Sequence, residues 1–429
     1  MSSSQSDPLL RSRRFAPLFT TQFLGTLNGN LVKTTMLFVL VFAQAKDASN
    51  SAMVSIAAAV FVAPMIIFSA FAGALADMRD KAALTRMIKI VEIAFVAIAA
   101  LAIAMQSTGA MLVSLFLLGT VSAFFGPIKY AIIPQHVRTD EIMSATGLIE
   151  AGTFVAILLG QIIGGLLSPT MASILAFLVA VVGFIASRMI QPAPPEHYNA
   201  TILPRPIAAT IDVITGSRRH RPIYIAILAI SWFWAVGAIL TSQLAIVVKD
   251  ELNATPAVAT LMLAMFSIGV AAGSMLASRL SKNAASMRPT AIAAIVMSCA
   301  LAGFVWAVSI HHPSEASQNV SAFFASEGSV TMLVALAIVA TAGGVFIVPL
   351  YAMLQMLGDP ARRSRDVAAN NILNAIFMVA GTGVAAGLAY AGLSSPQTLG
   401  IVAIANLLVG LRLATLNSDT HLRQIRPTA

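Results

Sequence analysis

The sequence predicts an all-α membrane protein with twelve transmembrane helices in two six-helix bundles. Twelve long apolar segments follow one another along the 429 residues, and a single long polar stretch divides them six and six. Hydrophobic residues make up 58% of the chain and charged residues only 10%, whereas a soluble domain carries about 25% charged residues. No soluble fold of this length exposes so little polar surface, so the apolar segments are expected to lie in lipid.

Each apolar segment is roughly 20–29 residues long, which is enough to cross a bilayer at about 1.5 Å per helical residue. The segments cover residues 15–43, 51–76, 86–106, 110–133, 143–167, 171–190, 222–248, 257–278, 289–310, 329–355, 366–391 and 396–416. The first is followed by Ala43-Gln44-Ala45, which resembles a signal-peptide cleavage site. Its apolar run exceeds the about 7–15 residues of a signal peptide, so we expect a retained spanning helix.

The polar stretch 191–221 defines the predicted domain organisation. Residues 1–190 form an N-terminal six-helix bundle, residues 191–221 a linker, and residues 222–429 a C-terminal six-helix bundle with a short tail. Such a plan is typical of secondary transporters that bind their substrate near the bilayer midplane. Within the linker, 202–217 carries isoleucines at helical spacing and predicts a surface helix on the inner leaflet.

The distribution of basic residues predicts the orientation. With the N-terminus in the cytoplasm, 21 of the 26 lysines and arginines fall on the cytoplasmic side, and only Lys46 and Lys249 fall on the opposite side. This bias follows the positive-inside rule. We therefore expect a multi-pass protein of the cytoplasmic (inner) membrane with both termini in the cytoplasm.

Several functional classes are excluded by composition and motifs. The net charge of +9 comes from short loops beside spans, so it does not indicate nucleic-acid binding. Cys299 is the only cysteine, so there is no cysteine metal cluster, and we expect it to be a small buried residue. No phosphate-binding Gly-x4-Gly-Lys-Ser/Thr loop occurs. We expect no enzyme activity, no cofactor and no metal.

Charged residues inside the spans predict a transport pathway. The first six segments contain Lys33, Lys89, Glu92, Lys129 and Glu150, whereas no Lys, Arg, Asp or Glu lies deep inside the last six. Ionisable groups in lipid are expensive and usually face a bundle interior. The pattern therefore predicts a transport protein with an asymmetric polar cavity, whose charged residues come from the first six spans.

The loop after the second span predicts a gating site. Gly73 permits close approach of two helices, and Asp77 is placed to cap a neighbouring helix or to pair with a basic residue, with Arg79 and Lys81 beside it. The equivalent loop after the eighth span lacks the aspartate, so gating is one-sided. Glu92 follows Lys89 by three residues in the third span. This pair is read either as part of the gating site or as a structural ion pair.

Lys129 and Glu150 are the predicted centre of the substrate site. Lys129 follows Gly126-Pro127, a helix-breaking pair that a membrane tolerates only beside protein or a wet cavity. It either extends to the interface or lies in the pathway. Glu150 lies about two turns into the fifth span, too deep to reach the interface. We expect it to pair with Lys129 or to contact a cationic headgroup.

Further polar residues inside the spans, several of them at helical spacing, complete the candidate site. For each of these residues the alternative role is a hydrogen bond between helices. The substrate-binding candidates besides Lys129 and Glu150 are Gln22, Thr26, Asn30, Lys33, Gln243, Asn370 and Asn374.

Longer motifs resemble the lysophospholipid transporter branch of the major facilitator superfamily, which includes the transporter portion of fused acyltransferase proteins. The resemblance covers nearly the whole chain. It rests on residues 22–33, 125–135, 147–160, 231–234, 347–352 and 368–374, and the loop 73–81 fits the superfamily pattern. It implies the major facilitator fold and movement of lysophospholipids to the inner leaflet by alternating access. The implied partners are a lysophospholipid or another amphiphile, membrane lipids and a separate acyltransferase.

Two departures from that branch concern charge. Relatives usually carry an aspartate where this chain has Gly29, and stand-alone members carry an arginine where it has Thr241. Both charges are absent, so neither partner is left buried alone.

The alternative function is proton-coupled export of drugs, siderophores or other small amphiphiles. Such antiporters often carry Gly-Pro-x-x-Gly-Gly in the fifth span, where this chain has Gln161 in the proline position.

Overall fold

The described residues are almost entirely helical. The structure, a computed structural model, describes residues 8–43, 49–195, 206–281, 287–311 and 317–418. Within them a single isolated β-bridge joins Ala254 and Gln318. Since a backbone in lipid must satisfy its own hydrogen bonds, long apolar segments form helices. The predicted spans are confirmed, with ends within about five residues of those observed.

The chain packs as two compact units. Unit 1 comprises residues 1–224 and 354–375, and unit 2 comprises residues 225–353 and 376–429. The division follows packing rather than chain order, so the end of one long helix and the start of the next belong to unit 1. The predicted boundaries at 190 and 222, which follow chain order, stay a prediction.

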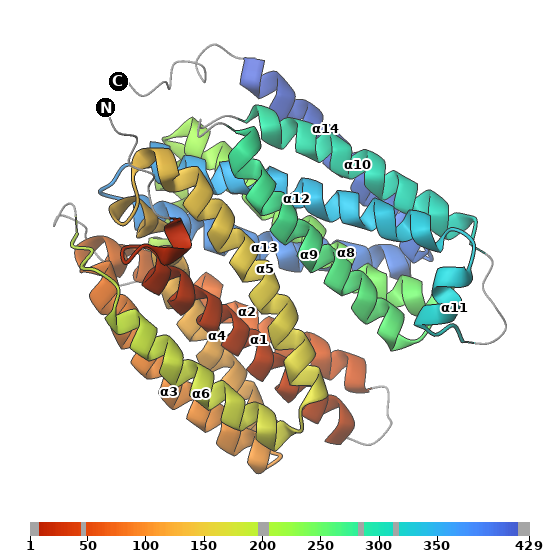
Figure 1. Ribbon diagram of the computed structural model, residues 1–429, viewed down its shortest axis with the longest axis horizontal. Coiled ribbons are helices and arrows are strands. Elements are labelled where there is room, and N and C mark those ends of the chain that lie inside the picture. Colours follow the sequence, from red (N-terminus) through yellow and green to blue (C-terminus); the bar gives the residue numbers. More distant parts are fainter. Residues whose placement is uncertain (1–7, 44–48, 196–205, 282–286, 312–316, 419–429) are drawn as a thin grey trace. The chain divides into compact units, whose positions relative to one another are not determined.

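Unit 1 contains the first six long helices and the linker helix (Figure 1). Its helices are α1 (Ala16–Ala43), α2 (Ser49–Met78), α3 (Lys81–Ala104), α4 (Thr108–Ala131), α5 (Ile142–Leu166), α6 (Pro169–Arg188) and α7 (Pro206–Arg218). Helix α1 packs along α5, and α3 lies beside α6. A Cβ at Gly160 or Gly164 of α5 would lie 2.6 Å from a carbonyl oxygen of α1, Leu27 or Leu31 respectively. These glycines therefore allow the two backbones to touch.

Short capping residues set where the helices of unit 1 begin. The Asp80 carboxylate accepts a hydrogen bond from the Ala83 amide at the start of α3, Ser107 does the same for α4, and Ser168 for α6. Helices α2 and α4 contain Pro64 and Pro127, each of which removes one backbone hydrogen bond. Proline 127 thus loosens α4 two residues before Lys129.

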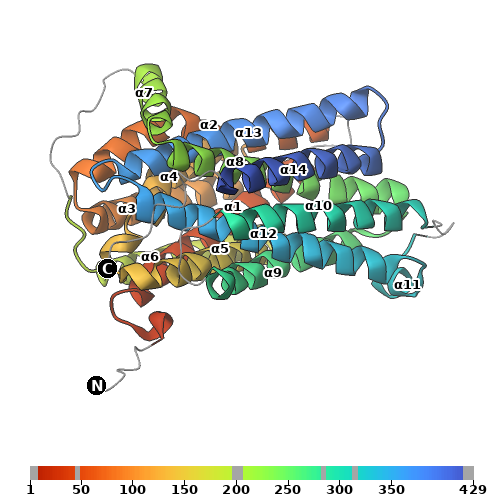
Figure 2. The same cartoon turned by 90° about the horizontal axis from the view of Figure 1, so that it is seen from above.

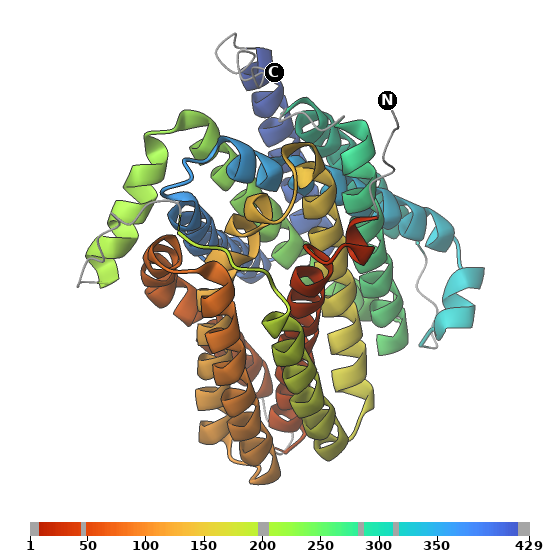
Figure 3. The same cartoon turned by 60° about the vertical axis from the view of Figure 1, so that its left-hand side comes forward.

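The linker helix α7 lies next to α2, as Figures 2 and 3 show. It confirms the helix predicted over 202–217 for the part that the structure describes; Ile202 lies outside the described residues. Ile207 and Ile211 are exposed. At its other end the Ser217 hydroxyl donates to Asp366, which also pairs with Arg362 at 3.3 Å.

Unit 2 contains most of the later helices. They are α8 (Arg221–Ile246), continued by a π-helical turn (Val247–Glu251), α9 (Pro256–Leu280), α10 (Arg288–Ser309), α11 (Val320–Ala325), α12 (Ser329–Leu357), α13 (Arg363–Tyr390) and α14 (Ser395–Ser418). Helix α10 packs along α14. Eleven helices in the described part of the chain are long and apolar enough to span a membrane. The twelfth predicted span is α1, whose 28 residues include the polar stripe of Gln22 to Lys33.

One expectation about unit 2 is wrong. Cys299, predicted to be buried, is exposed on α10. The neighbouring Ser298 and Met297 are buried instead. Because both faces of a membrane helix are apolar, hydropathy does not reveal which face points outwards.

Candidate functional site

Lys129 on α4 and Glu150 on α5 form a buried ion pair. The Lys129 Nζ atom lies 3.6 Å from Glu150 Oε1, and the glutamate side chain is fully buried. Lys129 also donates to the Thr153 hydroxyl at 2.8 Å. We call Lys129 and Glu150 the headgroup pair. The predicted pairing is thus confirmed, and Lys129 extends towards α5 rather than towards the interface.

Two further side chains hold this pair in place. The Tyr130 hydroxyl donates to Glu150 Oε1, and the Lys129 ammonium lies 4.8 Å from the centre of the Tyr130 ring. From α1, the Gln22 amide donates to the Lys129 backbone carbonyl at 2.9 Å. Glu150 Oε2 and Gln22 Oε1 are buried without a hydrogen-bond partner among the described residues. Buried acceptors are normally hydrogen-bonded, so these two oxygens are candidate contacts for a bound polar group.

A second ion pair occupies the α1–α3–α4 side of unit 1. Lys89 Nζ lies 2.6 Å from Glu92 Oε2, and both side chains are buried. Asn28 of α1 donates to the other oxygen, Glu92 Oε1, at 3.1 Å, and the Phe125 ring covers the ammonium at 5.1 Å. Since every one of these contacts is internal, the geometry favours the structural interpretation of this pair.

Asp77 caps the start of α13. Its carboxylate accepts hydrogen bonds from the Ser364 amide at 2.9 Å and the Arg365 amide at 3.4 Å, and it pairs with Arg365 Nε at 3.0 Å. An anion at a helix N-terminus is stabilised by the free amides and the helix dipole. We call Asp77, Ser364 and Arg365 the Asp77 clasp.

Gly73, one turn before Asp77, brings α2 against the same helix. A Cβ at this position would lie 2.7 Å from the Ala368 Cβ and 2.9 Å from the Ser364 carbonyl oxygen. The predicted roles of Gly73 in close approach and Asp77 in capping are therefore seen in the structure. Arg79, predicted to act with Asp77 in gating, is exposed, and the basic residue that pairs with Asp77 is Arg365. Lys81 is buried at the start of α3, where its amide donates to Ala193.

The remaining candidates are spread more widely. Asn30 donates to the Thr26 carbonyl of its own helix, and the Lys33 ammonium lies 5.3 Å from the Phe61 ring centre. Gln243 is buried in unit 2. Asn370 and Asn374 are buried in the part of α13 that belongs to unit 1. Both amide atoms of Asn370 lack a hydrogen-bond partner in the described structure, which makes it a candidate contact for a bound polar group.

Sequence reasoning missed four residues of these sites. Tyr130 and Thr153 bind the headgroup pair, Asn28 binds Glu92, and Arg365 binds Asp77. Only Thr153 carried a usable signal, because it follows Glu150 by three residues and so lies on the same face of α5. Among the described residues no cluster of His, Cys, Asp and Glu is suited to hold a metal ion.

Buried, paired charges inside a bundle of apolar spans define this chain as a membrane transporter. Residues 18–325 match the Major Facilitator Superfamily, and the chain belongs to that family.

Its relatives include the lysophospholipid transporters LplT of Salmonella newport and Salmonella typhimurium. Each is 26% identical over 325 residues, which is 73% of this chain and 72% of the relative. The resemblance stated from the motifs is thereby confirmed.

Solved structures share the fold. The human organic anion transporter MFSD10 (TETRAN) superimposes with a TM-score of 0.75 at 14% identity, covering 93% of this chain and 99% of that one. The E. coli fucose:proton symporter FucP gives 0.70 at 13% identity, with coverage of 94% and 98%. At these identities the likeness establishes the fold alone.

Proposed function

We propose that this protein moves lysophospholipids across the cytoplasmic membrane to the inner leaflet by alternating access. The observation that carries the proposal is the buried headgroup pair of unit 1, a cation and an anion on adjacent spans with one orphaned oxygen. The similarity to LplT supports the same substrate class. A lysophospholipid joins one acyl chain to a phosphate, and many carry an amine as well.

The headgroup pair suits a zwitterionic headgroup. The Lys129 ammonium has three N–H donors, two of which are directed to Thr153 and Glu150, so one remains for a phosphate oxygen. Glu150 Oε2 accepts no hydrogen bond from the described residues, so it can accept one from a substrate amine. In this proposal Tyr130 and Gln22 position the pair, and the amides of α1 and α13 contribute weaker contacts.

The Asp77 clasp is the proposed gating element. It ties α2 to the start of α13 through two backbone amides and one guanidinium. Alternating access requires a cytoplasmic contact that holds one state and opens in the other. We place this loop, both termini and the basic residues in the cytoplasm. Reacylation of the product by a separate acyltransferase would then keep transport running downhill.

The headgroup pair is tested with two substitutions and two substrates. Lys129→Ala should reduce uptake of lysophosphatidylethanolamine and lysophosphatidylglycerol into proteoliposomes alike, by roughly 10–100-fold. This corresponds to a charged hydrogen bond of about 1.5–3 kcal/mol. Glu150→Gln should reduce uptake of the amine-bearing lipid far more than that of lysophosphatidylglycerol.

The matched control is Lys249→Ala, which removes an exposed lysine. It should transport at the wild-type rate. Wild-type uptake in both site variants, at equal amounts of folded protein, would refute the assignment.

We further propose that transport needs no obligatory proton. Glu150 Oε1 already lies 3.6 Å from the Lys129 ammonium, so the carboxylate is engaged in an ion pair within the chain. No second acid of the described structure contacts it. The expected result is equal uptake with and without an imposed pH gradient. Several-fold stimulation by an inward proton gradient, lost in Glu150→Gln, would favour the proton-coupled exporter instead.

A further inference from the structure

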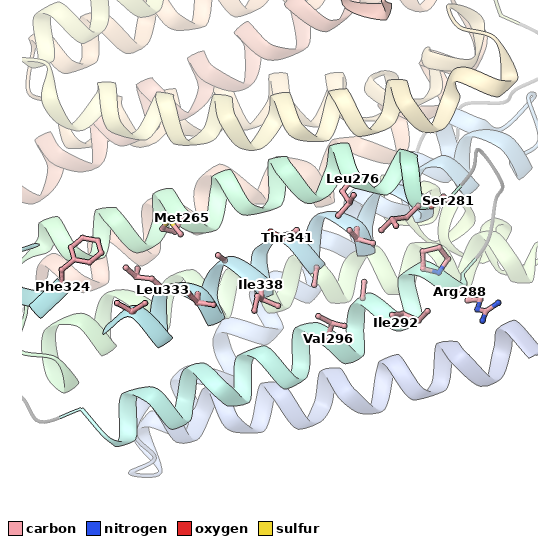
Figure 4. A pocket seen from close by; sticks show the side chains of 18 residues that line it. Met265, Leu276, Ser281, Arg288, Ile292, Val296, Phe324, Leu333, Ile338 and Thr341 are labelled. Atoms are coloured by element: carbon pink, nitrogen blue, oxygen red, sulfur yellow. The ribbon is translucent and has the colours of Figure 1, made fainter. Parts of the chain in front are cut away.

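Unit 2 contains a large apolar groove that the proposed transport site does not use. It has a volume of about 1,010 Å³ and lies among α9, α10 and α12, with Phe324 of α11 at one end (Figure 4). This is at the upper end of the volumes that hold small-molecule ligands. Several of its lining side chains, including Leu280, Ile292 and Val334, are more than half exposed. In a spanning segment such exposure means contact with lipid, so the groove is open to the bilayer.

The groove is apolar along its length and polar at one end. Arg288 is the one charged residue among the 18 that line it, and it lies at the start of α10 near Ser281. The Ser281 side chain is 6% exposed, and its hydroxyl has no hydrogen-bond partner among the described residues. A buried hydroxyl without a partner carries a desolvation penalty that a bound acceptor would remove. Arginine and serine together are suited to hold the oxygens of a phosphate.

The dimensions fit an acyl chain. The lining residues of α12 run from Val330 to Val345, fifteen residues apart, which is about 22 Å of helix. One leaflet of a bilayer is about 15 Å of hydrocarbon, half of the whole core. A chain that starts at the Arg288 end can therefore lie wholly inside the groove, against Leu276, Ile292, Val296 and Val345.

The equivalent helices of unit 1 provide an internal comparison. Helices α9, α10 and α12 are the eighth to tenth spans, and their counterparts in unit 1 are α2, α3 and α4, the second to fourth spans. The groove among α2, α3 and α4 has a volume of only about 240 Å³. Phe95 and Phe124 are among its lining residues, and none of those residues is charged. We call it the small groove. The small groove therefore has neither the capacity of the large groove nor a cationic end.

We propose that the large groove binds a resident phospholipid of the membrane, with its phosphate on Arg288 and Ser281 and one acyl chain between α9, α10 and α12. This lipid is distinct from the transported substrate, because its site contains none of the headgroup residues. It is expected to stabilise unit 2 and to remain bound when the protein is extracted gently.

The test uses the full-length protein in nanodiscs that contain phosphatidylglycerol with a photoreactive diazirine in one acyl chain. After irradiation and proteolysis, mass spectrometry should find the label on α10 and α12 around Val296 and Val345. Arg288→Ala should reduce this labelling at least fivefold, and Arg288→Lys should restore most of it. Ala337→Phe, which fills the groove, should reduce it as well, whereas Leu75→Phe in the small groove should not.

Two controls complete the design. A diazirine-bearing diacylglycerol, which lacks the phosphate, should label the groove several-fold less than phosphatidylglycerol. Excess lysophospholipid should not displace the label. The proposal is overturned if Arg288→Ala, eluting as a folded monodisperse protein, is labelled as strongly as the wild type, or if diacylglycerol labels the groove as well as phosphatidylglycerol does. Competition by lysophospholipid would also overturn it, because the groove would then be a route for the substrate.

Discussion

The two units bury different kinds of polar group. Eight charged residues are buried in the described structure, and all of them lie in unit 1: Asp77, Lys81, Lys89, Glu92, Glu141, Glu150, Arg363 and Asp366. Unit 2 buries amides, hydroxyls and aromatic rings. Trp232 donates to Asn406 at 2.9 Å, Trp234 donates to Tyr351 at 3.1 Å, and Phe233 stacks on Phe346. Within the described residues, buried charge is therefore concentrated in unit 1.

The difference shows how the two units of a transporter can carry different tasks. Neutral hydrogen bonds hold helices together at a modest free energy each, whereas a buried ion pair is stable only while both partners stay in place. Unit 1 therefore contains elements that a substrate or a conformational change can disturb strongly. Unit 2 is held together by neutral contacts, whose individual loss costs less stability, and it also contains the large groove. The expectation that the last six spans contain no deeply buried charge agrees with this, since Arg363 and Asp366 lie in the first turn of α13.

The largest effect is expected from splitting the internal ion pair of unit 1. Lys89→Ala leaves Glu92 buried with Asn28 as its one remaining side-chain partner among the described residues, which should lower the free energy of unfolding by about 3–5 kcal/mol. Thermal unfolding of the purified protein should show a clear fall in melting temperature.

The matched change in unit 2 is Ser274→Ala, which removes a buried hydroxyl bonded to its own helix at 2.8 Å. It should alter stability by less than about 1 kcal/mol. The double variant Lys89→Met with Glu92→Met should recover much of the loss, because no unpaired charge remains. A melting temperature for Lys89→Ala equal to that of Ser274→Ala would contradict the contrast between the units.

An intermediate effect is expected at the Asp77 clasp. Asp77→Ala removes the cap and the ion pair to Arg365, which should weaken the contact between α2 and α13 by about 1–3 kcal/mol. In a Cys299→Ala background, a Thr26→Cys reporter on α1 should react several-fold faster with a thiol reagent added from the cytoplasmic side.

Asp80→Ala is the control for the clasp. The Asp80 carboxylate also accepts two backbone amides, those of Ala83 in α3 and Ala193 in the segment after α6. Among the described residues it makes no hydrogen bond to α13. Its loss should leave the labelling rate unchanged. Equal rates in Asp77→Ala and the wild type would remove the gating role from the clasp.

The smallest effect is expected in the amide network of unit 2. Trp232→Phe removes one donor to Asn406, while Asn406 keeps its own bonds to Ala294 and Ser298. The loss should be about 0.5–1.5 kcal/mol, as for a neutral hydrogen bond. Thermal unfolding would measure this loss, with Trp306→Phe as the control because Trp306 is an exposed tryptophan of α10. A loss of stability as large as that of Lys89→Ala would mean that unit 2 also depends on a critical polar core.

The amino-acid sequence was sufficient to locate the spans and the charged residues inside them. Bilayer thickness fixes how long an apolar run must be, so twelve runs could be located without any knowledge of packing. Glycine and aspartate one turn apart, as at Gly73 and Asp77, indicated a close helix contact and a cap. The high price of a buried charge made Lys129 and Glu150 candidates for a pair.

Which side chains meet depends on how the helices pack in three dimensions. A lipid-facing side and a packed side are both apolar, so hydropathy left the rotation of each helix open, and Cys299 was placed on the wrong face. The pairing of Asp77 with Arg365, and the contacts of Tyr130 and Thr153 with the headgroup pair, depend on which helices pack together. The groove around Arg288 likewise exists only because α9, α10 and α12 come together in the fold. Contacts of this kind join residues far apart in the chain, and no local pattern encodes them.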